Sequence, residues 1–105
     1  MIKELSNNIF FMYEGDTGTI GFSLSGDCQS GDRYIFAIKK TLDDEPLIYQ
    51  TYERSEFTVD ITEELSQLLP AGNYLWGLKL NRVIDGEKEI DTLVGSGTLR
   101  VRKGV

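Results

Sequence analysis

The chain has 105 residues, of which 40% are hydrophobic and 27% charged, and this composition is typical of a single globular domain. It contains no histidine and one cysteine, Cys28, which excludes histidine-dependent catalysis, an internal disulfide and a four-ligand Cys/His zinc site. The 17 acidic and 11 basic residues give a formal charge of −6, which argues against nucleic acid and anionic membranes as partners.

Hydrophobic residues mostly alternate with a period of two, and turn-forming residues recur about every ten positions, as in a sandwich or barrel of short strands. Asp85-Gly86 is typical of a hairpin tip, and Gly95-Ser96-Gly97 of a bend or bulge. No apolar run approaches the ~20 residues of a membrane-spanning helix. We predict seven strands, over residues 9–13, 19–25, 33–40, 47–52, 56–61, 73–81 and within 89–102.

Residues 62–69 break this alternation. Thr62, followed by Glu63 and Glu64, is typical of a helix N-cap with acidic residues in the first turn, where they favour the helix dipole. We therefore predict a short helix of about two turns before the sixth strand.

A corner follows this helix, formed by Leu69, Pro70, Gly72 and Tyr74. It resembles the connection into the sixth strand of immunoglobulin-like and fibronectin type III sandwiches, where a tyrosine hydroxyl bonds back to the preceding connection. Trp76 shares its phase with Tyr74 and is expected in the core. The predicted fold is all-β: a seven-stranded immunoglobulin-like or fibronectin-III-like sandwich with one short helix, forming one domain over residues 1–105.

Glycines and acidic turns are the first candidates for a chemical site. Gly15, Gly18 and Gly21 are not followed by the lysine of a phosphate-binding loop, so turn and packing roles explain them better. Acidic groups at 27 and 32 or at 43–45 could bind calcium, but neither set has a recognised ligand spacing, which favours solvated loops.

Catalytic groups are also lacking in the sequence pattern. Cys28 has no basic neighbour in the sequence closer than Arg33, so a lowered thiol pKa is not indicated. No carboxylate stands in an apolar context that would raise its pKa for acid–base work. We therefore expect no catalytic, metal or cofactor-binding residue and no small-molecule substrate, and we expect that the protein is not an enzyme.

One face of the sheet is predicted to bind another protein. If Trp76 points inward, the opposite side of three neighbouring strands is partly apolar and positive on an otherwise negative chain. Such a face suits an acidic neighbouring subunit, including the Asp43-Asp44-Glu45 turn of another copy. A solvated face with edge cations that prevent aggregation is the alternative. The candidate contact residues are Ile35, Ala37, Lys39, Leu75, Lys79, Arg100 and Arg102.

Four short segments, together with a strand that contains Leu78 and Leu80, carry a family resemblance. They are Glu14-Gly15-Asp16-Thr17, Asp60-Ile61-Thr62, Leu69-Pro70-Ala71-Gly72-Asn73-Tyr74 and Thr92-Leu93-Val94-Gly95-Ser96-Gly97-Thr98-Leu99-Arg100-Val101. This combination resembles the N-terminal β-sandwich domains of upper-baseplate and related tail proteins of tailed bacteriophages and prophages, over residues 13–103.

The resemblance implies a non-enzymatic virion or prophage structural protein that binds other virion subunits, with a homo-oligomer as one form. It also implies a virion location after assembly in the bacterial cytoplasm, a reducing compartment that suits a chain without disulfides. The alternative is a carbohydrate-binding or host-surface adhesion module. That function requires exposed aromatic side chains aligned on one face, for which Tyr34, Tyr49 and Tyr52 are the candidates.

Overall fold

A computed structural model describes residues 2–6, 8–24, 28–84, 86 and 88–104. Among them the prediction of an all-β chain is confirmed, and the seven predicted strands correspond to β2–β8, whereas β1 has no counterpart in the prediction. β1 is exposed at a sheet edge, so no alternation of buried and exposed positions marks it. The elements are β1 (Lys3–Ser6), β2 (Ile9–Tyr13), β3 (Gly18–Ser23), β4 (Arg33–Lys39), β5 (Ile48–Tyr52), β6 (Glu56–Ile61), α1 (Glu63–Ser66), β7 (Gly72–Ile84) and β8 (Lys88–Arg102).

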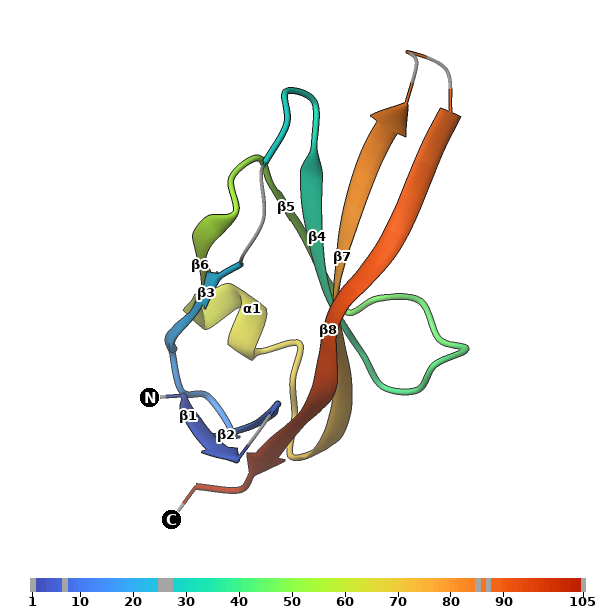
Figure 1. Cartoon of the computed structure of the whole chain (residues 1–105). Helices are drawn as coiled ribbons and strands as arrows, with labels where there is room; N and C mark the ends of the chain where they lie inside the picture. Colours follow the sequence, from blue (N-terminus) through green and yellow to red (C-terminus); the bar gives the residue numbers. More distant parts are fainter. Residues whose placement is uncertain (1, 7, 25–27, 85, 87, 105) are drawn as a thin grey trace.

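The strands form two layers. Six of them make one sheet in the order β1-β2-β8-β7-β4-β5, while β3 and β6 pair separately. β2 runs parallel to β8, and the other neighbours are antiparallel. In Figure 1 the β3–β6 pair and α1 lie on one side of the large sheet, and the loop between β4 and β5 projects on the other. We call these two sides of the six-stranded sheet the inner face and the outer face.

The core lies between the two layers. Trp76 and Leu78 on β7 point inward and are 4% and 1% exposed, as predicted from their shared phase. The indole ring lies 5.4, 5.7 and 6.1 Å from the ring centroids of Phe10, Phe22 and Phe36, which come from three other strands. Trp76 therefore joins both layers at the centre of the molecule.

α1 is shorter than predicted, with one turn instead of two. Thr62 is its N-cap, and the side-chain oxygen accepts a hydrogen bond from the Leu65 N–H at 3.3 Å. Pro70 disfavours helical backbone at the residue before it, so the helix cannot continue through Leu69. Leu69 is instead fully buried under the turn into β7, whereas Leu68 is 46% exposed.

The tyrosine corner is present at the start of β7. The Tyr74 hydroxyl donates a hydrogen bond to the Pro70 carbonyl oxygen, which satisfies a phenol that is otherwise buried. Burial first, and the nearby Glu14 carboxylate second, raise the pKa of the Tyr74 phenol. The Glu14 carboxylate also accepts a hydrogen bond from the Ala71 N–H at 2.6 Å, so the corner is tied to the turn after β2.

β7 and β8 extend beyond the rest of the sheet as a two-stranded ribbon. β4 pairs with β7 only as far as Asn81, and β2 pairs with β8 only from Thr98 onward. We call residues 82–84 of β7 and 88–94 of β8 the arm. It projects at the top of Figure 1, and the molecule is 52 Å long but only 26 and 25 Å across. Asp85, predicted at the tip, lies outside the described residues, and Gly86 has a φ of +73°.

The predicted bulge lies beside the glycines rather than on them. The register of β8 against β7 shifts at Val94, which has no partner, one residue before Gly95-Ser96-Gly97. Gly97 is needed for close approach instead, because a Cβ there would lie 1.8 Å from the Asn8 carbonyl oxygen.

Candidate interaction surface

The predicted contact residues share the outer face. The strand register aligns Ile35, Lys79 and Leu93 in one row across β4, β7 and β8, and Lys39 with Leu75 in another. Arg100 and Arg102 alternate with buried side chains on β8, so they point to the same side. The full set comprises Ile35, Ala37, Lys39, Leu75, Lys79, Arg100 and Arg102.

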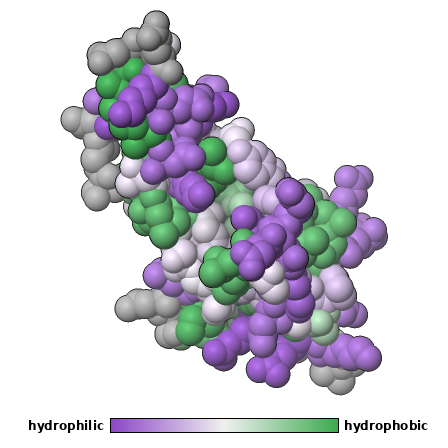
Figure 2. All heavy atoms as spheres, turned by 90° about the vertical axis from the view of Figure 1, so that its right-hand side faces the viewer, coloured by the Kyte–Doolittle hydropathy of each residue, from purple (hydrophilic) through white to green (hydrophobic). Residues whose placement is uncertain are grey.

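This face combines half-buried apolar residues with exposed cations. Ile35, Ala37 and Leu75 are only half-buried, while Lys79 and Arg100 are exposed. Figure 2, which views the molecule from the side on which the β4–β5 loop projects, shows hydrophobic patches separated by hydrophilic groups. Covering these apolar side chains with a partner would remove further apolar area from water.

β2 adds two aromatic residues that the sequence reasoning missed. Phe11 and Tyr13 lie opposite Arg100 and Arg102 in the register, and their rings meet edge to face at 5.0 Å. Tyr13 is 44% exposed. The signal was available in residues 9–13, where an unbroken apolar run, rather than an alternating one, indicates a strand with apolar side chains on both faces.

The charges on this face are available to a partner. Lys39, Lys79, Arg100 and Arg102 form no ion pair with any residue that the structure describes. They stand on one side of a chain whose net charge is −6. A partner surface rich in carboxylates would therefore gain attraction here without first breaking such ion pairs.

The β4–β5 loop borders the same face. Leu42 is 78% exposed at the start of the Asp43-Asp44-Glu45 turn, so an apolar side chain and three carboxylates project together. An open depression of about 360 Å³ lies between the loop and the sheet and is lined by Lys40, Thr41, Leu42, Asn73, Tyr74, Leu75 and Thr98. The acidic turn and the basic face thus occur on one side of the molecule.

Asp32 corrects the prediction of a solvated acidic loop. Its side chain is buried, and the Arg82 guanidinium donates two hydrogen bonds to it, at 3.0 Å to Oδ1 and 2.8 Å to Oδ2. The Gln29 N–H donates a third, at 2.8 Å. Because Arg82 is the first residue of the arm, this ion pair ties the β3–β4 connection to the base of the arm. Asp27, the other acid of this predicted site, lies outside the described residues.

We predict that the loss of this ion pair at low pH makes the fold less stable in acid. Hydrogen bonds from Arg82, and then from Gln29, hold the pKa of the Asp32 carboxyl below its ordinary value of 3.8. A carboxyl whose pKa is lower in the folded state than in the unfolded state stabilises the fold at pH values above its unfolded-state pKa. This stabilisation is lost as the pH falls through the pKa of the folded state. The urea midpoint should fall from about pH 5 to about pH 2, and Asp32→Asn should reduce that fall. Parallel pH curves for the two proteins would contradict this role.

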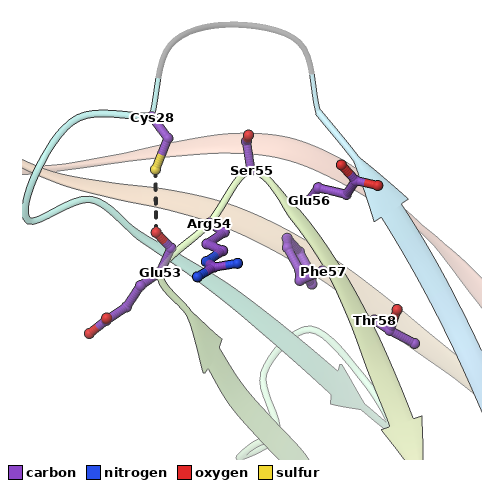
Figure 3. A pocket seen from close by; sticks show the side chains of 7 residues that line it. All are labelled: Cys28, Glu53, Arg54, Ser55, Glu56, Phe57 and Thr58. Carbon is purple, nitrogen blue, oxygen red and sulfur yellow. Dashed lines mark hydrogen bonds between the residues drawn. The ribbon is translucent and has the colours of Figure 1, made fainter.

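Cys28 lies in an open depression of about 550 Å³ (Figure 3), with a thiol that donates to the Glu53 carbonyl oxygen at 3.4 Å. The carboxylates of Glu53 and Glu56 lie at opposite ends of this depression rather than converging on the sulfur. The groups lining it therefore do not form a nucleophile and base held in contact.

The three candidate tyrosines of a sugar platform do not share an exposed face. Tyr34 is 4% exposed on the inner face, and Tyr52 stacks on Phe57 with ring centroids 4.4 Å apart. Tyr49 is 59% exposed, but it lies opposite Ala37 on the outer face. These residues do not provide the aligned aromatic surface that the adhesion alternative requires.

Comparison of the chain with protein-family models, with curated proteins and with solved structures finds no match. Within the described ranges, no helix is long and apolar enough to cross a membrane. The same residues contain no group of three or more Asp, Glu, Cys or His side chains placed to hold a metal ion. The function must therefore be inferred from the outer face itself.

Proposed function

We propose that this protein is a non-enzymatic structural subunit of a phage or prophage tail or baseplate, assembled in the bacterial cytoplasm and retained in the virion. It acts by binding other virion subunits through the outer face. The observation that carries this proposal is the joint presence, on a strongly acidic chain, of half-buried Ile35 and Leu75 with four cations that form no ion pair with the described residues. That combination fits an acidic protein partner better than a small molecule.

An immunoglobulin-like identity of the sandwich is part of the proposal. The separate β3–β6 pair corresponds to strands B and E of such a fold, and the adjacent β4, β7 and β8 to strands C, F and G. The bond from Tyr74 to Pro70 occurs where that fold has its tyrosine corner. Rigid sandwiches of this kind present a preformed sheet face, which lowers the entropic cost of docking.

The tail-type assignment is supported by where the resembling segments lie. Glu14-Gly15-Asp16-Thr17 forms the turn into β3, and Asp60-Ile61-Thr62 leads into α1. The corner precedes β7, and residues 92–101 lie within β8, which contributes Arg100 to the outer face. The resemblance and the proposed docking face therefore share β8 and the start of β7.

Particles from a strain that encodes this chain test the proposal. The protein should co-purify with tail structures through a density gradient and be detected there by mass spectrometry. Lys79→Glu and Arg100→Glu should each reduce its content in particles by at least about tenfold, because each places a carboxylate where the partner's carboxylates dock.

Arg54→Glu is the matched control, since it makes the same charge change on the turn between β5 and β6. It should leave incorporation unchanged. Absence of the wild-type protein from the particles would overturn the proposed function, and equal loss in all three variants would overturn the assignment of the outer face.

A further inference from the structure

Exposed apolar side chains gather on the arm. Five large ones are between 36% and 60% exposed there: Val83, Ile84, Ile90, Leu93 and Val94. Register and alternation place Ile84 and Ile90 on the extension of the inner face, and Val83 and Leu93 on the extension of the outer face. Figure 2 shows hydrophobic atoms at this upper end of the molecule. A concentration of this kind is uncommon on a surface that stays in water.

The arm is also unsupported as a sheet. Residues 82–84 and 88–90 form only two strands, because β4 does not pair beyond Asn81, and β2 does not reach any of residues 88–94. Its base is held by the Arg82–Asp32 ion pair and by Asn81, which donates to Asp91 at 2.7 Å and accepts from Arg33 at 3.3 Å. Above that base a two-stranded ribbon alone is only marginally stable in water, so the arm gains from an added strand.

β8 offers an open edge for such a strand. The Thr98 N–H donates to the Asn8 carbonyl at 3.0 Å, and the Arg102 carbonyl accepts from the Glu14 N–H at 2.7 Å, so alternate residues there face β2 rather than β7. The same alternation continues along β8, with Val94 as one extra residue at the register shift. It places the backbone N–H of Leu93 on the side away from β7, at the open edge.

Charged side chains do not protect the middle of this edge. Glu89 lies 3.8 Å from the Arg33 guanidinium, and Asp91 accepts the hydrogen bond from Asn81. Both carboxylates are therefore held over the outer face of the sheet. Edge strands that remain unpaired usually carry charges or prolines that block a further strand. Lys88 is the remaining charged residue of this segment and stands at its far end, whereas residues 92–97 carry neither a charge nor a proline.

We propose that a second copy of this chain occupies the edge, with β8 of each copy pairing antiparallel to β8 of the other across a two-fold axis. The occupant must be an extended strand with an open edge of its own and apolar side chains on both faces. β8 of a second copy meets each of these requirements, and a two-fold axis satisfies both edges at once. This dimer depends on the arm alone, and it does not require the outer face to bind anything.

Salt separates this contact from one made by the outer face. Two copies with a formal charge of −6 each repel one another, so screening by added salt should tighten a dimer held by backbone bonds and apolar contacts. A contact between the basic face and an acidic turn should weaken under the same conditions.

Sedimentation equilibrium of the purified protein, over a concentration series at low and high salt, tests the proposal. We expect a monomer–dimer equilibrium that shifts toward dimer as salt rises. Leu93→Pro removes the edge N–H without removing a bond to β7, and it should weaken the dimer by at least about tenfold. Leu93→Lys should have a similar effect by charging the apolar strip, and it remains informative if the proline variant fails to fold by circular dichroism.

Leu42→Lys is the matched control, because Leu42 is even more exposed but lies on the β4–β5 loop. It should leave the dimer unchanged. A strict monomer at every concentration would overturn the proposal, as would a dimer that weakens with salt or that tolerates both Leu93 substitutions.

Discussion

Replacing Trp76 with alanine should lower the free energy of unfolding by about 3–5 kcal/mol, the range for removing a large buried aromatic ring. The indole contacts rings from β2, β3 and β4, and its Nε1–H donates to the Asn8 carbonyl at 3.0 Å. The substitution therefore leaves a cavity between the two layers and removes a hydrogen bond. Urea denaturation followed by circular dichroism measures the change, since the variant has no tryptophan.

Tyr49→Ala provides the comparison, because this ring is 59% exposed on the outer face. It should change the free energy of unfolding by no more than about 0.5 kcal/mol. If Trp76→Ala lowered the free energy of unfolding by less than about 1 kcal/mol, the indole would not be packed between the two layers as described above.

Gly97→Ala should be nearly as damaging, with a loss of roughly 2–4 kcal/mol from overpacking and broken hydrogen bonds. The new methyl group would lie 1.8 Å from the Asn8 carbonyl oxygen and 2.8 Å from its carbonyl carbon, so the backbone must move. That carbonyl accepts the bonds from Trp76 and from the Thr98 N–H, and displacing it breaks both. The same urea experiment gives the size of the effect.

Gly77→Ala is the matched control on the neighbouring strand. No heavy atom lies within 4 Å of the Cβ it would add. Its effect should stay within about 1 kcal/mol, because alanine also restricts the unfolded chain. Equal losses for the two glycine variants would indicate that strand propensity, and not the approach of Asn8, explains Gly97.

The sequence was sufficient to predict the elements in which one face is buried and the other is exposed. In β7 the alternation of Trp76 and Leu78 with Leu75 and Lys79 predicts which side is buried. In the structure Trp76 and Leu78 are buried, Leu75 is half-buried and Lys79 is exposed. Tyr74 could be assigned to a corner because a half-buried phenol needs an acceptor and Pro70 marks the turn before it. Each of these signals is local, because it lies within one short segment of the chain.

Features that depend on distant partners could not be predicted. Asp32 has an ordinary loop sequence around it, and only the approach of Arg82 from β7 makes it a buried ion pair. The extension of β7 beyond residue 81 was not predicted, because Val83 and Ile84 interrupt the alternation expected for a half-buried strand. Val83 and Ile84 pair only with β8 and are exposed on opposite sides, so no buried face imposes a pattern on them.

The candidate surface was predictable in its members but not in its extent. Ile35, Lys79 and Arg100 could be placed on one side because three neighbouring strands were given a common phase. The addition of Tyr13 depended on β2 joining β8 in parallel, and a strand sequence does not specify which edge it will join.

The parallel pairing of β2 with β8 has a consequence for synthesis. Ile9 pairs with Thr98, nearly the whole length of the chain later. On the ribosome, β2 therefore has only β1 beside it until Thr98 and the residues after it have been translated, and Phe10 and Met12 lack the cover of β8 in the meantime. Contacts so far apart in sequence form slowly, and such a nascent chain is open to aggregation during that interval.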